Sequence, residues 1–310
     1  MKLKTEKKKV VHLDPEGWAR KVRLRKRAAL MTVIVLAAAA AVYFLLSRCI
    51  IPASRYASAE SALRRGEIAE AIAGFTSAGS WRGGLSRAAE IAFSEQGDPS
   101  IRRRLSEAEH GSIVEFGHYE QDGETADGAE PISWVVLDKR DGQLLLLSEK
   151  VLDAVPYNET ECDITWAECS LRRWVNGEFL SAAFTGEERL LIITKKHLNE
   201  NNSVSGAKGG ASTVDTVFIP SLEDLLSAAR LKRGFSIYDL SAAPTVYARS
   251  RGLEGSPYGG SSCWWTRTPG SGQSTVMYAD MGGSLLHSSR PDRTNYGVRP
   301  MIWVFAGDAG

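Results

Sequence analysis

Residues able to recognise a ligand are concentrated near the end of the sequence, on the connections between the last predicted strands. Flat aromatic rings alternate there with short polar groups, the mixture that recognition loops use for contact area and hydrogen bonding. We predict a ligand-binding surface from these positions: Tyr278, Asp280, His287, Arg290, Asp292, Asn295 and Tyr296. Asp280, Asp292 and Asn295 also offer oxygen ligands for a structural calcium ion, although no calcium-loop spacing accompanies them.

No residue pattern typical of a catalytic centre is present in the sequence. A hydrolase needs a nucleophile beside a positioned base, and His118, His197 and His287 have no serine or cysteine motif around them. The G-x-S-x-G, H-E-x-x-H and P-loop patterns do not occur. We therefore expect no catalytic residues and, apart from that calcium ion, no metal and no cofactor.

Four cysteines, Cys49, Cys162, Cys169 and Cys263, leave the redox chemistry open. No pair has C-x-x-C spacing, so a zinc or thioredoxin-like site is not indicated. An oxidising exterior would permit a disulfide between Cys162 and Cys169, whereas the aromatic neighbours of Cys169 and Cys263 favour buried free thiols.

A second group of residues combines tryptophan with arginine inside the predicted strands and helices. Each arginine lies beside aromatic residues, so we expect hydrogen bonds and cation–π contacts that link turns to the core rather than a binding role. The residues assigned to this structural group are Trp134, Trp166, Arg172, Trp174, Trp264, Trp265, Arg267 and Arg299.

These residues lie in a predicted domain of short antiparallel strands with a few helices, residues 111–306. The first strands are expected at 112–116, 131–137 and 143–148, with Asp141-Gly142 as a hairpin turn before the third. The third is apolar throughout, which predicts a central position in its sheet. The closing part predicts four further strands, at 262–270, 275–280, 282–287 and 296–305.

Between these two sets of strands, the sequence predicts helices and one long loop. A helix is expected over 165–176, capped by Thr165, and another from Ser221 after the apolar strand 217–219. Residues 199–212 are rich in Asn, Gly and Ser, which predicts a long mobile loop.

Residues 28–47 form an uncharged run of twenty residues, long enough for a helix to cross the roughly 30 Å hydrocarbon core of a bilayer. Residues 1–27 hold eleven Lys or Arg and three acidic residues. That asymmetry predicts a single transmembrane helix with a cytoplasmic N-terminus and everything after Arg48 outside. We expect the helix to begin at Asp14 and to stop at Pro52.

Three alternatives compete with a membrane span. A cleaved signal peptide has a shorter apolar core and a shorter leader, and Arg48 excludes a lipoprotein processing site. A buried core helix is disfavoured by the flanking charge.

The basic leader serves either as a topology signal or as an attachment to anionic lipid. Nucleic acid is not an expected partner, because only Trp18 among these charges could stack on a base.

Residues 53–110 predict a short all-helical stalk of two antiparallel hairpins divided by glycines. The series Tyr56, Ala59, Leu63, Gly66, Ala69, Ala71 and Phe75, followed by Gly79 and Trp81, resembles a tetratricopeptide repeat, whose small residues let two helices approach closely. One good repeat and a degenerate second are too few for a freestanding peptide-binding array. We interpret the segment as a packed spacer, with a docking face for a membrane or wall partner as the alternative.

Five motifs in order resemble an uncharacterised bacterial family of surface proteins built as membrane helix, repeat-like hairpins and outer domain. They are Phe116-Gly117-x-Tyr119, Pro131-Ile132-x-Trp134, Trp166-x-x-Cys169-x-Leu171-Arg172-x-Trp174-x-Asn176, Trp264-Trp265-Thr266-Arg267-Thr268-Pro269-Gly270 and Gly297-Val298-Arg299-Pro300. More distantly, the outer domain is similar to the C-type-lectin-like fold of sulfatase-modifying enzymes and receptor-binding proteins. The resemblance implies an α+β class: one transmembrane helix, the stalk, then a C-type-lectin-like domain.

The same resemblance bears on enzymatic activity. The oxidase branch of that fold uses a pair of cysteines, one just after its terminal Gly-x-Arg, whereas here Pro300 and Met301 follow Arg299 and Cys263 is alone. Our leading hypothesis is a non-enzymatic, membrane-anchored surface protein that binds a glycan, a wall polymer or a protein through its C-terminal loops. The alternatives are a modifying enzyme and a membrane-tethered scaffold acting through the stalk.

Overall fold

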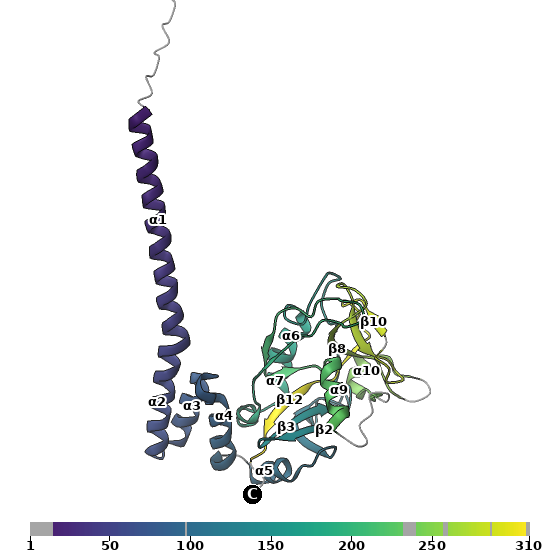
Figure 1. Ribbon diagram of the computed structural model, residues 1–310. Coiled ribbons are helices and arrows are strands. Elements are labelled where there is room, and N and C mark those ends of the chain that lie inside the picture. The colour runs from purple at the N-terminus through teal and green to yellow at the C-terminus, as the bar shows by residue number, and fades with distance from the viewer. Residues whose placement is uncertain (1–14, 97, 232–239, 257–259, 286, 308–310) are drawn as a thin grey trace, which may run out of the picture.

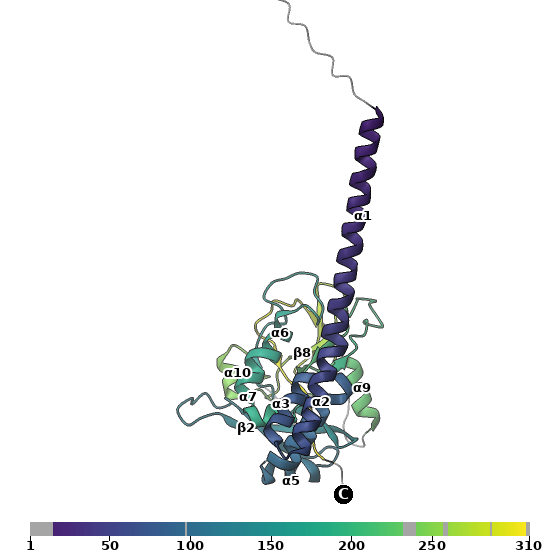
Figure 2. The ribbon, with the colours of Figure 1, turned by 90° about the vertical axis from the view of Figure 1, so that its left-hand side faces the viewer.

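The computed structural model describes the chain except for residues 1–14, 97, 232–239, 257–259, 286 and 308–310. Its described residues form a long N-terminal helix, a set of short helices and a mixed α+β region with two five-stranded sheets. In Figure 1 the purple helix extends away from the rest of the molecule, and in Figure 2 it does so again from a perpendicular direction.

The N-terminal helix is longer than expected. α1 (Pro15–Leu45) continues through a π-helical turn, η1 (Leu46–Ile50), into α2 (Ile51–Arg64). The prediction that Pro52 stops the helix is wrong: the helix continues through Pro52, which directly follows the π-helical turn. Residues Arg23–Arg64 form one helix long and apolar enough to cross a membrane, a test that a signal sequence also passes, and none of its apolar window is buried.

The predicted close approach of the first two stalk helices is present. α2 turns at Gly66, whose φ is 78°, and packs against α3 (Ile68–Ala78). A Cβ atom built on Gly74 would lie 2.7 Å from the Cβ of Ala59, so only small residues allow this separation. The rings of Tyr56 and Phe75 meet edge to face at 4.9 Å.

The later stalk helices pack on the strands. They are η2 (Trp81–Gly83), α4 (Gly84–Ile91), η3 (Ala92–Gln96) and α5 (Pro99–Glu107). Asp98 caps α5 as predicted, accepting a hydrogen bond from the Ser100 backbone N–H at 2.7 Å. α5 contacts β1, and the Phe93 ring of η3 meets Phe305 at 5.5 Å. Stalk and sheets therefore share one apolar core.

The first sheet has the order β1-β2-β3-β12-β7. Its strands are β1 (Ile113–Tyr119), β2 (Glu130–Arg140), β3 (Gln143–Ser148), β12 (Met301–Phe305) and β7 (Val217–Phe218). The predicted central position of β3 is confirmed. Asp141 and Gly142 both have positive φ, 50° and 66°, as a two-residue hairpin turn of the primed type requires.

The second sheet has the order β10-β9-β8-β11-β4, and a separate two-stranded ribbon pairs β5 with β6. The strands are β10 (His287–Ser289), β9 (Val276–Ala279), β8 (Trp264–Pro269), β11 (Gly297–Val298), β4 (Asp153–Ala154), β5 (Lys195–His197) and β6 (Thr213–Asp215). The strand predicted over 296–305 is divided, because Arg299 and Pro300 carry the chain from the second sheet to the first. The strand predicted over 282–287 is largely a turn, and β10 begins at His287.

Helices surround both sheets. They are α6 (Ser170–Trp174), η4 (Val175–Phe179), α7 (Leu180–Ala183), α8 (Gly186–Leu191), α9 (Leu222–Leu231) and α10 (Val246–Ser250). The helix predicted from Thr165 begins only at Ser170, since the Cys169 thiol, and not Thr165, accepts the capping hydrogen bond from the Arg172 backbone N–H.

Residues 199–212 lack regular structure as predicted, but hydrogen bonds attach them to their neighbours. The side chain of Asn202 donates to the Pro269 carbonyl at 2.8 Å, and the hydroxyl of Ser205 donates to the Gly270 carbonyl at 2.7 Å. Asn202 is buried. The expectation of a mobile loop overlooked asparagine as an internal hydrogen-bonding group.

The close contact between α2 and α3 predicts a strong effect of side-chain size. We expect Ala59→Leu to lower the free energy of unfolding by about 1–3 kcal/mol, because the added atoms have no space beside Gly74. Ala57→Leu, on the exposed face of the same helix, is the matched control and should change it by less than about 0.5 kcal/mol. Urea titration of both variants measures the difference, and equal values would contradict the packing.

Candidate functional site

Four of the seven predicted ligand-binding residues lie together at the edge of the second sheet. Tyr278 on β9 pairs in register with His287 on β10, so both side chains lie on the same face. Their rings stack with centroids 5.9 Å apart, and Tyr296, just before β11, meets the Tyr278 ring at 4.6 Å. We call Tyr278, His287 and Tyr296 the ring cluster.

A buried tryptophan supports the ring cluster from below. Trp265 on β8 has no exposed surface, and its ring stacks on Tyr296 with centroids 4.4 Å apart. Its indole N–H donates to the Val155 carbonyl at 3.2 Å, which fixes the ring plane. Tyr278 and Tyr296 are half-buried, so each keeps part of its ring available to a ligand. The cluster therefore has a rigid base and an accessible outer face.

Asp280 orients the histidine of the cluster. One of its carboxylate oxygens accepts hydrogen bonds from the backbone N–H groups of Gly282 and Ser284, at 2.8 and 2.9 Å. The other lies 3.1 Å from His287 Nε2, while the His287 side chain stays 52% exposed. The cluster thus presents an exposed imidazole beside two phenol rings. Burial and the hydrogen bond to Tyr296 raise the pKa of Tyr278, so its hydroxyl stays protonated at neutral pH.

The other three predicted residues are not shown in contact with the rings. Arg290 pairs with Asp292 at 2.8 Å and with Glu161 at 3.1 Å, and Asn295 is exposed. Asp280 and Asp292 are thus held by protein partners, so their geometry does not favour the calcium site considered from sequence. Calcium binding by them stays a prediction from sequence.

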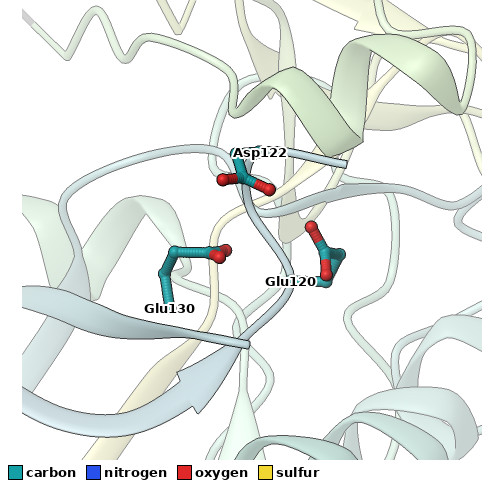
Figure 3. A group of neighbouring side chains, drawn as sticks. All are labelled: Glu120, Asp122 and Glu130. Atoms are coloured by element: carbon teal, nitrogen blue, oxygen red, sulfur yellow. The ribbon is translucent and has the colours of Figure 1, made fainter. Parts of the chain in front are cut away.

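A different set of acidic side chains lies close together in Figure 3, where Glu120 and Asp122 follow β1 and Glu130 begins β2. One carboxylate oxygen from each lies within 4.8 Å of the others. Sequence reasoning missed this group because ten residues separate its ends. Exposed acidic groups gather on many surfaces without an ion, and nothing else at this turn indicates one.

An apolar cavity of about 480 Å³ adjoins the ring cluster, and His287 belongs to both. Its walls come from α9, the loop around Asn202, and strands β9 and β10. Its apolar lining residues include Leu222, Leu226, Met277 and Leu285. The sequence feature that relates to this cavity is the spacing of leucines on α9. The same spacing occurs in ordinary core helices, so it does not indicate a cavity.

The residues assigned to the structural group are mostly buried, Arg172 and Trp174 being partly exposed. Asp215, which the sequence analysis did not select, forms hydrogen bonds with two residues of this group and with one further residue. Its buried carboxylate accepts from Arg172 Nε at 2.6 Å, Thr213 Oγ1 at 2.7 Å and Trp166 Nε1 at 3.0 Å. This network attaches α6 to β6.

Two more arginines of that group are themselves buried. Arg267 Nη2 lies 2.7 Å from Asp224 Oδ2. Arg299 donates from Nε to the Ser148 carbonyl at 2.8 Å, and its guanidinium lies 5.2 Å from the Trp264 ring centroid. Arg267 therefore connects β8 to α9, and Arg299 connects the link between β11 and β12 to β3 and β8.

All four cysteines are free thiols, so the disulfide considered between Cys162 and Cys169 is absent. Cys169 is buried as predicted, and burial raises the pKa of its thiol to about 12. Cys263 is only partly buried, a departure from the prediction, and burial raises its pKa as well. A nucleophilic cysteine requires a lowered pKa, so neither environment favours thiolate chemistry.

The fold and this site define an α+β protein with a long N-terminal apolar helix and an antiparallel-sheet domain. Residues 141–306 match the domain of unknown function DUF6273, and the chain belongs to that family. No curated protein and no solved structure matches the chain. The matched residues include both the ring cluster and the cavity beside it.

The Asp215 network predicts a large loss of stability on truncation. Asp215→Ala should lower the free energy of unfolding by about 3–5 kcal/mol, because Arg172 loses its carboxylate and buried donors lose their acceptor. Asp127→Ala, at an exposed turn, is the control and should cost less than about 0.5 kcal/mol. Denaturant titrations of the two variants compare them, and a similarly small cost for Asp215→Ala would show that the network contributes little.

Proposed function

We propose that this chain is a non-enzymatic, single-pass membrane protein whose outer domain binds a glycan or wall polymer through the ring cluster. The observation that carries the proposal is the accessible arrangement of Tyr278, His287 and Tyr296 over buried Trp265. Flat rings offer apolar faces to the C–H groups of a sugar, and the neighbouring imidazole and phenol groups exchange hydrogen bonds with its hydroxyls. A protein ligand with exposed aromatic side chains is the other occupant that such a surface accepts.

The adjoining apolar cavity favours a ligand with a short apolar substituent. Because His287 lies in both the ring cluster and the cavity wall, a sugar on the rings would bring such a group, for example an acetyl group, to the His287 end of the cavity. The cavity has the volume of a small-molecule site. A decorated saccharide therefore fits better than an undecorated one.

The membrane assignment rests on the helix and its flanking charge. The apolar segment of this helix is fully exposed. Exposing so much apolar surface to water is unfavourable, which supports a lipid environment for the helix. The excess of Lys and Arg before residue 28 favours a cytoplasmic N-terminus, so the outer domain would lie on the other side.

The C-type-lectin-like fold is part of the same proposal. Two of the motifs on which the resemblance to that fold depends contact each other: Arg299 of the Gly-x-Arg motif lies over the ring of Trp264 in the tryptophan-rich strand. The resemblance supports the fold, and the function is argued from the ring cluster itself.

Binding of the full chain in detergent to a panel of wall polysaccharide fragments tests the ring cluster. We expect Tyr296→Ala and His287→Ala each to weaken binding about tenfold or more, because a ring lost from a contact surface costs on the order of 1–2 kcal/mol. His118→Ala, at another exposed histidine, is the control for His287→Ala and should leave the affinity unchanged.

Tyr296→Phe separates the two parts of the contact. It keeps the stacking on Trp265 and removes the hydroxyl, so it should retain most of the affinity if ring contact dominates. Unchanged binding in both alanine variants, with the variants still folded, would reject the ring cluster as the site.

The topology is tested separately with tags at both ends of the chain. In spheroplasts, added protease should remove the C-terminal tag and leave a protected fragment that carries the N-terminal tag, because the bilayer shields residues before Arg48. An N-terminal tag missing from the mature chain would indicate a cleaved signal peptide. A C-terminal tag that resists protease until the cells are permeabilised would reverse the proposed orientation.

A further inference from the structure

A second cavity, of about 360 Å³, lies between the β2–β3 hairpin, β5, β12 and α9. It shares no lining residue with the apolar cavity beside the ring cluster. Its lining combines apolar side chains with polar and charged ones. The nitrogen-bearing side chains come from three strands: Arg140 on β2, Lys195, Lys196 and His197 on β5, and Arg267 on β8. We call it the basic pocket.

Two side chains in the wall of the basic pocket have buried nitrogen atoms without a hydrogen-bond partner. Arg267 is only 4% exposed. Its Nη2 donates to Asp224 and its Nη1 to the Leu198 carbonyl and the Asn199 side-chain oxygen, while Nε has no partner. His197 is 8% exposed, its ring lies 3.9 Å from that of Phe218, and its Nε2 has no partner. Buried polar groups are nearly always satisfied, so two exceptions in one wall point to an acceptor from a ligand.

Lys195 adds an ammonium group that lacks a carboxylate partner among the described residues. Its Nζ lies 3.4 Å from the centroid of the Trp303 ring, where the ring face attracts the cation. Burial, together with the nearby charge of Arg140, lowers the pKa of Lys195 to about 8, although Asp138 and Asp141 oppose this shift. The ammonium form therefore predominates at neutral pH.

Most carboxylates that line the basic pocket already form an ion pair with an arginine of the protein. Asp138 pairs with Arg140 at 3.1 Å, and Asp224 with Arg267 at 2.7 Å. Glu223 lies 3.5 Å from Arg230, and Glu200 is an exposed carboxylate at the wall. The groups that still need a partner are thus mainly donors.

We propose that the basic pocket binds a small organic anion, whose carboxylate or phosphate oxygens accept hydrogen bonds from Lys195, Arg267 and His197. The Arg267 guanidinium is held in place by Asp224 and Leu198, so the ligand meets a donor that is already oriented. The volume accommodates more than a bare ion, and charged groups on both sides of the pocket favour a compact molecule. This site is independent of the ring cluster.

Titration calorimetry of the full chain in detergent at pH 7 tests the proposal, with succinate and glucose 6-phosphate as probes. Succinamide and glucose are the uncharged controls and should not bind. Lys195→Gln should weaken binding at least tenfold, while Lys195→Arg should retain it. Lys150→Gln, at an exposed lysine beyond the other end of β3, is the matched control and should have no effect.

Two further measurements exclude a merely structural role for Lys195. Succinate stays fully ionised above pH 7, so its affinity for the wild type should fall as the pH rises through about 8, where Lys195 loses its proton, and should stay level in Lys195→Arg. Glu200→Gln should strengthen binding, because it removes a repelling charge. No binding of either anion, or an equal loss in Lys150→Gln, would overturn the proposal.

Discussion

The arrangement of the two sheets depends on a buried arginine at the point where the chain leaves one sheet for the other. Arg299 donates to the Ser148 carbonyl at the end of β3 and lies over the Trp264 ring of β8. Burial lowers its pKa to about 10, because the protein interior disfavours the charged form. On either side, Leu152 N–H donates to the Val298 carbonyl and Ser148 N–H to that of Pro300. The second sheet, and with it the ring cluster, is therefore fixed to the first.

Prediction from sequence succeeded where near neighbours determine the structure. Asp141 and Gly142 adopt the positive φ that their types favour, and the apolar run of β3 occupies the centre of its sheet. It failed where distant segments decide. The strand over 296–305 is divided because sheet membership changes at Arg299, and Pro52 continues a helix because the π-helical turn before it leads directly into the first turn of α2.

The candidate site shows the same division. Residue type and loop position were sufficient to select Tyr278, His287 and Tyr296, since these positions follow from the order of the last strands. Their support was not predictable, because the contact of Trp265 with Tyr296 requires the parallel pairing of β8 with β11. Asp215 was missed for a similar reason: 43 residues separate it from Arg172, and no local pattern marks a buried acceptor.

The same packing relates the ring cluster to the apolar helix. α1 is continuous with α2, α2 packs on α3, and the stalk contacts β12 through Phe93 and Phe305. β12 follows directly from Arg299, β11 and the ring cluster. The described residues of this series form helices, strands and short turns in contact with one another, so packed side chains, rather than the length of a tether, determine how the ring cluster is presented relative to the helix. Under the proposed function, a short rigid spacer would suit recognition of a polymer close to the bilayer, because the ring cluster would then keep one height and one orientation.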